Sequence, residues 1–301
     1  GIVGYGPQHW EVFTVDPCIY PTFAKAKNIA FAYDLESRTT RTLQPLPTEE
    51  TGWTKYFQTL DIAQVRTANF MSTITAYGYE DQARSKSKYM HRPSGGAVSN
   101  LWLKDHGYLQ ASSVTKYQRP EPMHFPEAPG IRSLTPRIEF TDSSEYFTNL
   151  YEFNADLQIV PTEPSSGLFR ITASGELKNS EWQMGGIRYS YKYEFSDSSV
   201  KKSVTLRYHD SHSTVSIIEP VIQYAGMTFE KVDTRTVIIT AKNKRIKFSV
   251  TDGDVELVIG RDKENYWAPY PALKAYPLEL VVQPPVDGFL RSVSYSFTIL
   301  K

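Results

Sequence analysis

The sequence predicts an all-β protein, a large antiparallel supersandwich preceded by a short N-terminal helical segment. Three observations lead to this fold class: apolar and polar residues alternate along many short stretches, turn-forming residues separate those stretches, and one early segment lacks the alternation. A period of two with a single apolar face is typical of half-buried antiparallel strands, because parallel sheets are usually covered on both faces.

Three stretches show the alternation most clearly: residues 151–159, 189–195 and 293–299. Runs of turn-forming residues lie between such stretches, at residues 164–167, 196–199, 209–212 and 251–254. The last run predicts a hairpin turn that joins residues 247–250 to residues 255–259. From about residue 53 to the end of the sequence we therefore expect strands and turns.

The N-terminal part has a different composition. Residues 22–32 are rich in alanine and lysine and follow Pro21, and proline is favourable in the first turn of a helix. We expect a short helix there, followed by a linker or long loop over residues 37–51. The sequence thus predicts a helical lead and linker over residues 1–52 and an antiparallel β-supersandwich over residues 53–301.

Length and charge exclude several classes of protein. A chain of 301 residues can bury a large core, and 33 Lys and Arg balance 33 Asp and Glu. Nucleic-acid-binding proteins normally carry a basic excess or stripe, so we expect no nucleic-acid partner. No stretch reaches the roughly 20 apolar residues of a membrane span, and we expect no signal peptide at the start of this sequence. Cys18 is the single cysteine, which excludes an intrachain disulfide.

Residues 89–125 concentrate the residue types that a binding or catalytic site requires. The stretch contains histidines, arginines, an asparagine and tyrosines: His91, Arg92, Asn100, His106, Tyr108, Tyr117, Arg119 and His124. Loops on a rigid β scaffold commonly carry such groups. Each histidine taken singly is better explained as a solvated loop residue, whereas their shared window favours a site. We predict that these side chains lie on one surface near Asn100.

Two glycines, Gly95 and Gly96, precede an apolar stretch inside this window. Paired glycines permit positive φ and a close approach of another backbone or a ligand. The sequence favours a bulge or tight packing between sheets over a ligand contact.

No metal, phosphate or hydrolase motif accompanies the window. His209 and His212 have the spacing of a turn and lack a cysteine or carboxylate at the usual ligand spacing. We therefore expect no metal and no cofactor.

Several segments resemble the β-sheet region of heparinase II/III-like proteins. They are RTANFMSTITAY at residues 66–77, GGAVSNLW at 95–102, GYLQASS at 107–113, IIEPV at 217–221 and YWAPYP at 266–271. Such proteins pair an N-terminal (α/α) toroid with a C-terminal antiparallel supersandwich, and many are polysaccharide lyases. The resemblance covers most of the chain and implies that the helix over residues 22–32 is the last piece of a toroid.

The resemblance implies β-elimination on an acidic, uronate-containing polysaccharide or oligosaccharide. Such an enzyme neutralises the uronate carboxylate, removes the adjacent proton with Tyr or His and protonates the leaving oxygen. Most of these groups lie on the toroid, which has no room before residue 53, so we expect this chain alone to be inactive. The resemblance also implies a periplasmic or extracellular location. His91 and His106 are candidate catalytic residues, and the candidate carbohydrate contacts are Arg92, Asn100, Tyr108, Tyr117, Arg119 and His124.

Two other interpretations remain open. The chain could be a stand-alone carbohydrate-binding or structural β-module without catalysis. A mutarotase-like sugar enzyme that uses a histidine pair is less favoured, because the sequence shows no second catalytic carboxylate.

Overall fold

The computed structural model describes residues 49–77, 93–113, 130–163, 166–241, 244–269 and 272–300. The helix expected over residues 22–32 lies outside these ranges. Within them, the regular structure consists of β-strands and two short 3-10 turns, η2 (Asn149–Tyr151) and η4 (Lys263–Asn265). The all-β antiparallel fold class is therefore confirmed.

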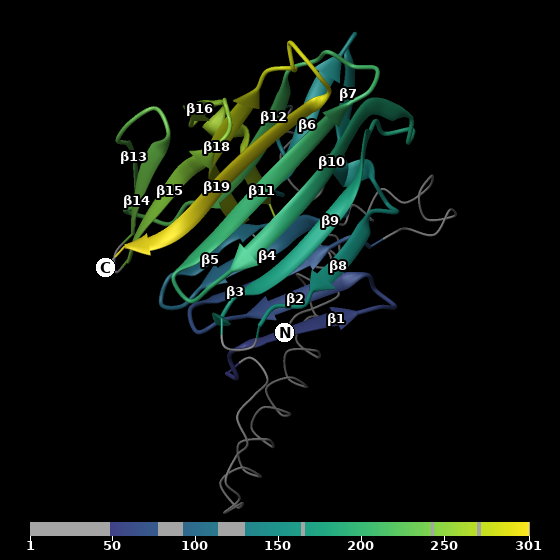
Figure 1. Ribbon diagram of the computed structural model, residues 1–301. Coiled ribbons are helices and arrows are strands. Elements are labelled where there is room, and N and C mark those ends of the chain that lie inside the picture. The colour runs from purple at the N-terminus through teal and green to yellow at the C-terminus, as the bar shows by residue number, and fades with distance from the viewer. Residues whose placement is uncertain are drawn as a thin grey trace, which may run out of the picture. The chain divides into compact units, whose positions relative to one another are not determined.

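One sheet is a meander of five consecutive strands, each antiparallel to the next. Its strands are β1 (Trp53–Phe57), β2 (Ile62–Arg66), β3 (Phe70–Thr75), β4 (Ala97–Leu103) and β5 (Gly107–Ala111). The core face carries Val65, Ile74 and Leu101, all fully buried. In Figure 1 this sheet lies below the long strands of the second sheet.

The second sheet contains 14 strands among the described residues. Their bounds are β6 (Arg137–Asp142), β7 (Glu145–Thr148), β8 (Asp156–Val160), β9 (Phe169–Lys178), β10 (Met184–Phe195), β11 (Ser199–Tyr208), β12 (Val215–Ile222), β13 (Thr228–Lys231), β14 (Thr236–Ala241), β15 (Lys244–Asp252), β16 (Glu256–Ile259), β17 (Trp267–Pro269), β18 (Ala272–Val282) and β19 (Leu290–Leu300). The order is β13-β14-β15-β19-β11-β10-β9-β7-β6-β12-β18-β16, with β8 beside β9 and β17 beside β18. A single register pair, Thr148 with Lys178, joins β7 to β9, so the sheet divides there into two halves.

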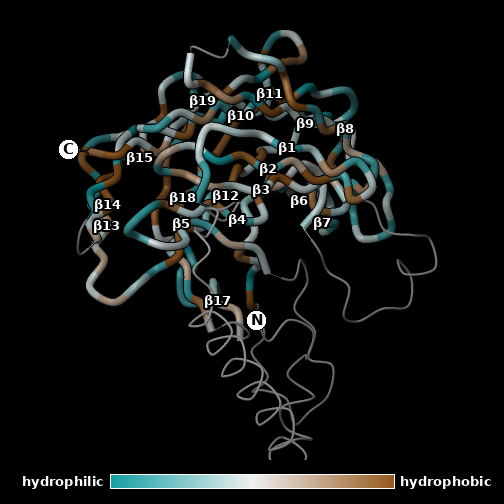
Figure 2. Tube along the Cα trace, turned by 90° about the horizontal axis from the view of Figure 1, so that it is seen from below, coloured by the Kyte–Doolittle hydropathy of each residue, from teal (hydrophilic) through white to brown (hydrophobic). Residues whose placement is uncertain are grey.

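The two halves of the large sheet and the small sheet share one hydrophobic core. Tyr193 on β10, Ile217 on β12, Leu101 on β4 and Phe297 on β19 belong to the same buried cluster. A second cluster that includes Leu134 packs on the opposite face of β12 and β18, so β12 is covered on both faces. Figure 2 shows the underlying alternation as hydrophobic and hydrophilic segments that follow one another along the strands.

The alternation of the sequence locates two of its three clearest strands correctly. Residues 189–195 lie in β10 and residues 293–299 in β19, with their aromatic side chains in the core. The strand expected over residues 151–159 begins later, at Asp156, and Tyr151 lies in a 3-10 turn. The hydroxyl of Thr148 accepts a hydrogen bond from the amide of Leu150 there, which favours a turn over an extended strand.

The hairpin predicted at residues 251–254 is wrong. β15 pairs with β14 and β19, whereas β16 pairs with β18, so the two flanking strands do not pair with each other. Gly253 lies against β19 with φ +98°, and a Cβ atom there would approach the carbonyl oxygen of Ser292 to 2.5 Å. The turn residues therefore carry the chain away from β19 to a different part of the sheet.

Gly95 and Gly96 are packing residues, as the sequence favoured. A Cβ atom on Gly95 would lie 1.9 Å from the carbonyl oxygen of Asn149, and one on Gly96 would lie 2.2 Å from Cβ of Ala173. The hydroxyls of Tyr189 and Tyr193 donate hydrogen bonds to the carbonyl oxygens of Gly95 and Gly96, at 2.9 and 2.7 Å. The glycines let the start of β4 approach β9 and β10 closely.

Candidate functional site

Three of the eight residues predicted to form a site are described by the structure: Asn100, His106 and Tyr108. The other five lie outside the described residues: His91, Arg92, Tyr117, Arg119 and His124. Convergence of the whole set on one surface therefore stays a prediction.

Asn100 and Tyr108 lie on the same face of the five-stranded sheet, away from the core. Trp102 pairs directly with Tyr108, and Asn100 precedes Trp102 by two residues on β4. Tyr108 is 48% exposed. Its backbone is fixed by Tyr224, whose hydroxyl accepts from the Tyr108 amide at 2.9 Å and donates to the Tyr108 carbonyl at 3.1 Å.

His106 lies in the turn before Tyr108 and packs edge-on against Tyr224, with the ring centroids 5.4 Å apart. Burial, and then the charge of Lys244, lower the pKa of His106, so the imidazole is neutral at pH 7. Its Nε2 atom is buried and has no hydrogen-bond partner among the described residues.

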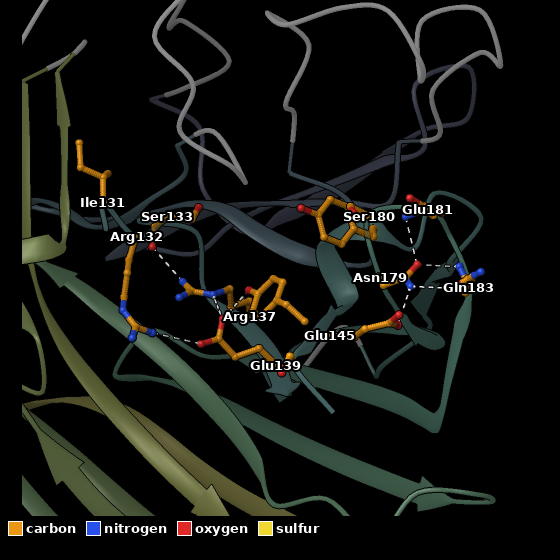
Figure 3. Close-up of a pocket in the computed structure, with 13 residues that line it drawn as sticks. Ile131, Arg132, Ser133, Arg137, Glu139, Glu145, Asn179, Ser180, Glu181 and Gln183 are labelled. Atoms are coloured by element: carbon orange, nitrogen blue, oxygen red, sulfur yellow. Dashed lines mark hydrogen bonds and ion pairs between the residues drawn. The ribbon is translucent and has the colours of Figure 1, made fainter. Parts of the chain in front are cut away.

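A second region, which sequence analysis did not single out, contains a hollow of about 560 Å³. The β6–β7 hairpin, residues 131–133 and the turn between β9 and β10 line this hollow (Figure 3). Its volume falls in the range of small-ligand sites. A hollow of about 350 Å³ adjoins it and shares the side chains of Arg132, Glu139 and Tyr146. We refer to the two hollows together as the groove.

The alternation of β6 and β7 places the polar side chains of the hairpin in the groove. Phe140 faces the core and stacks on its cross-strand partner Phe147, with the ring centroids 4.8 Å apart. Arg137 and Glu139 lie on the opposite side of β6, since side chains alternate along a strand. The same register puts Tyr146 on that side.

Arg137, Glu139 and Tyr146 form a hydrogen-bonded network at the base of the groove. The Arg137 side chain donates to a Glu139 carboxylate oxygen and, at 2.8 Å, to the Ser133 carbonyl. Burial lowers the pKa of Arg137, but Glu139, Tyr146 and Tyr266 together raise it more, so the guanidinium stays charged. The Tyr146 hydroxyl donates to the same carboxylate at 2.5 Å.

The hydroxyl of Tyr146 is hydrogen-bonded to Glu139, whereas the residue is partly exposed. Burial of the hydroxyl and the neighbouring Glu139 charge raise the pKa of Tyr146 well above the ordinary range. The residue as a whole is nevertheless 37% exposed. Tyr151 packs against its ring almost perpendicularly, with centroids 6.4 Å apart. The orientation of the Tyr146 ring is thus fixed from two directions.

Asn179 closes the wall of the larger hollow. Its Oδ1 accepts from the amides of Glu181 and Gln183, at 3.0 and 2.9 Å, and its Nδ2 donates to Glu145 at 3.1 Å. Figure 3 shows these bonds converging on Asn179.

Arg132 lies between the two hollows. One of its terminal nitrogens is 3.1 Å from Asp262, the other is 3.6 Å from Glu139, and its side chain is 42% exposed. Across the lining of both hollows, three arginines face five carboxylates: Arg132, Arg137, Arg261, Glu139, Glu145, Glu181, Asp262 and Glu279. The groove is therefore slightly acidic, and within the described part of the chain no cluster of His, Cys, Asp and Glu is suited to hold a metal ion.

Sequence analysis missed the groove because Arg137 and Glu139 have the pattern of a solvated strand face. The available signal was their spacing of two, which places opposite charges side by side on one face of a strand. Nothing in the sequence indicates that residues 131–133 and Tyr266 cover that face.

Comparison with known structures concerns the fold. A heparinase III structure aligns with a TM-score of 0.57 at 8% identity, covering 88% of this chain and 38% of the other. The heparan sulfate lyase of Pedobacter heparinus aligns with a TM-score of 0.55 at 8% identity, covering 93% of this chain and 41% of the other. At these identities the likeness concerns the fold, a supersandwich that also occurs in polysaccharide lyases.

Sequence comparison identifies the family. The family described as the ulvan lyase C-terminal domain matches residues 54–296. A broad-specificity ulvan lyase of Formosa agariphila is 25% identical over 304 residues, covering 96% of this chain and 45% of that protein. The chain belongs to the ulvan lyase C-terminal domain family, and it spans less than half the length of this relative. The expected relation to the C-terminal region of polysaccharide lyases is thereby confirmed. Among the described residues there is no helix long and apolar enough to cross a membrane.

Proposed function

We propose that this chain is the sandwich region of a polysaccharide lyase and contributes contacts to an acidic, uronate-containing polysaccharide. The family match over residues 54–296 carries the proposal. The relative of known name acts on ulvan, so ulvan is the substrate to test first. In this proposal, β-elimination takes place in a longer chain that includes a toroid, located in the periplasm or outside the cell.

The residues proposed for these roles come from the window over residues 89–125. His91 and His106 are the candidates for proton transfer, and the saccharide contacts are assigned to Arg92, Asn100, Tyr108, Tyr117, Arg119 and His124. Arginine suits a uronate because its guanidinium pairs with a carboxylate through two parallel hydrogen bonds.

The test is to incubate the purified chain with ulvan and follow the ultraviolet absorbance of the unsaturated product. We expect no turnover, because elimination requires a carboxylate neutraliser, a base and an acid within hydrogen-bond reach, and one wall of a cleft leaves the reacting proton exposed to water. The longer chain with its toroid should cleave. Steady turnover by this chain alone, lost in His91→Ala or His106→Ala, would contradict the proposal.

One observation favours the second candidate function, a carbohydrate-binding module. In the groove, Tyr146 presents a partly exposed aromatic ring of the kind that packs on sugars. The gene sequence upstream of Gly1 separates the two candidates, because a lyase requires coding sequence for a toroid there.

A further inference from the structure

The groove has room for more than one unit of a linear ligand. Its hollows of about 560 and 350 Å³ adjoin each other and share Arg132, Glu139 and Tyr146. A single small molecule would fill one hollow, whereas consecutive units of a chain would occupy both and cross the shared side chains.

Tyr146 offers a flat apolar surface at this crossing. Its hydroxyl is bonded to Glu139 at 2.5 Å, so the ring cannot turn away, and the residue is 37% exposed. A pre-oriented aromatic ring with one polar end suits a sugar, which has an apolar ring face and polar edges.

Two carboxylates that line the larger hollow have capacity to accept further hydrogen bonds. Glu145 and Glu181 form no ion pair among the described residues. The Tyr151 hydroxyl, which also lines this hollow, forms no hydrogen bond within the described ranges. Ionised carboxylates accept strong hydrogen bonds from hydroxyl groups.

The same carboxylates disfavour a negatively charged ligand in the larger hollow. Arg137 is 3% exposed and bonded to Glu139, and Arg132 already faces Glu139 and Asp262. A uronate would have to displace one of these partners and approach Glu145 and Glu181, and like charges at short range repel.

We propose that the groove binds consecutive units of the polysaccharide with an uncharged sugar unit in the larger hollow, where the Tyr146 ring stacks on the sugar and Glu145 and Glu181 accept hydrogen bonds from its hydroxyls. This inference rests on the proposed function only in taking a polysaccharide as the ligand. It places the contacts to uronates elsewhere on the chain.

The first test measures binding of ulvan oligosaccharides to the chain by isothermal titration calorimetry. Tyr146→Ala should weaken binding about three- to tenfold, the range expected for loss of an aromatic contact. Tyr56→Ala is the matched control, because Tyr56 is 40% exposed and its hydroxyl is bonded to Asp61, yet it lies outside both hollows. Equal affinities for the two variants overturn the assignment of the groove.

Two further variants distinguish the contribution of the Tyr146 ring to binding from the contributions of the surrounding polar groups. Tyr146→Phe keeps the ring and should retain most of the affinity; a loss as large as that of Tyr146→Ala overturns stacking. Glu181→Ala removes an exposed acceptor without touching the core and should weaken binding about threefold. An unchanged affinity of Glu181→Ala would show that Glu181 does not contact the ligand. This result does not depend on whether Tyr146→Ala folds.

Carboxyl-reduced ulvan oligosaccharides, in which the uronates have become alcohols, test the preference for an uncharged unit. The factor lost in Tyr146→Ala should be as large for these as for the native ones, and a loss confined to the native ligand overturns the charge argument. If the chain binds both ligands but Tyr146→Ala and Tyr56→Ala have equal affinities, the assignment of the groove is wrong and the proposed function stands. If the chain binds neither ligand, the assignment of the groove and the proposed function are both wrong.

Discussion

Two polar networks of this protein have similar chemistry and opposite surroundings. The sealed network consists of Gln110, Lys202, Glu219 and Tyr295, and all four residues are at most 1% exposed. The groove network consists of Arg132, Arg137, Glu139 and Tyr146, of which Arg132 and Tyr146 are more than a third exposed. Each network contains a carboxylate that receives a cation and a tyrosine hydroxyl.

The sealed network joins distant parts of the fold. Lys202 on β11 donates to Gln110 on β5 at 2.9 Å and to Glu219 on β12 at 2.5 Å, and Tyr295 on β19 donates to Glu219 at 2.7 Å. The small sheet and both halves of the large sheet therefore meet at one carboxylate. Its partners are all internal, so it can specify the packing of the sheets but cannot reach a ligand.

The groove network has the same kind of centre with one side open. Glu139 fixes the orientation of Tyr146 as Glu219 fixes that of Tyr295, but the Tyr146 ring borders two hollows. A buried carboxylate whose partners are all internal can only fix packing, whereas one whose partners also reach solvent is open to a ligand.

Alkaline pH should unfold the protein cooperatively. Burial raises the pKa of Tyr189, Tyr191, Tyr193 and Tyr295 well above 10.0. Above pH 10 the unfolded chain loses these protons and the folded chain keeps them, so stability falls as pH rises, by about 1.4 kcal/mol per unit of pKa separation for each group. The lowered pKa of Lys202 acts in the opposite sense, but one group does not offset four.

Circular dichroism and tyrosinate absorbance, followed together against pH, check this expectation. Exposed tyrosines among the 20 contribute a gradual rise of absorbance, whereas the buried ones should ionise in the same transition that removes the β signal. Complete ionisation of the tyrosines with the β signal intact would show that these four are not sealed.

Lys202→Met should lower the free energy of unfolding by about 3–5 kcal/mol, because it leaves the Glu219 carboxylate buried without its cation. Urea unfolding measures the loss. Lys201→Met is the matched control, since Lys201 is only half-buried on the other face of β11, and it should change stability by less than about 0.5 kcal/mol. The double variant Lys202→Met with Glu219→Leu should recover much of the loss. A cost of Lys202→Met similar to that of the control would contradict a sealed network.

Removing each tyrosine hydroxyl compares the two networks directly. Tyr295→Phe should cost about 1–3 kcal/mol, because one Glu219 oxygen then has no donor in a dry environment. Tyr146→Phe should cost less, about 0.5–1.5 kcal/mol, because Glu139 keeps Arg137 and Arg132. Urea unfolding of both variants measures the two costs. A larger cost for Tyr146→Phe than for Tyr295→Phe would contradict the distinction between a sealed and an open network.

The sequence predicts the large strands because their aromatic residues alternate strictly, as in residues 189–195 and 293–299. It even contains a signal for the sealed network. Lys202 occupies an inward position of the pattern Val200, Lys202, Val204, Leu206, all of which are buried. Its partners could not be predicted, because Gln110, Glu219 and Tyr295 lie 17 to 93 residues away and only the sheet order brings them together.

The groove was harder to predict than the core. Arg137 and Glu139 occupy the outward positions of β6, where charge is the ordinary outcome and carries no information about a site. Their burial results from segments distant in sequence, such as Tyr266, whose ring lies 5.8 Å from the Arg137 guanidinium. The hairpin at residues 251–254 was wrong for a related reason: local turn residues indicate where a strand ends but not which strand pairs next.

Arg132→Met applies the substitution used at Lys202 to the open network, and it should have the smallest effect. Its side chain is 42% exposed, and its contacts to Asp262 and Glu139 are 3.1 and 3.6 Å long. Exposed ion pairs contribute about 0–1 kcal/mol, and salt of about 1 M screens charges beyond roughly 3 Å. We therefore expect a loss below about 1 kcal/mol in urea unfolding at low salt, and almost none at high salt. A loss as large and as independent of salt as that of Lys202→Met would mean that Arg132 is sealed like Lys202, and a sealed Arg132 would leave no continuous groove for a sugar chain to cross.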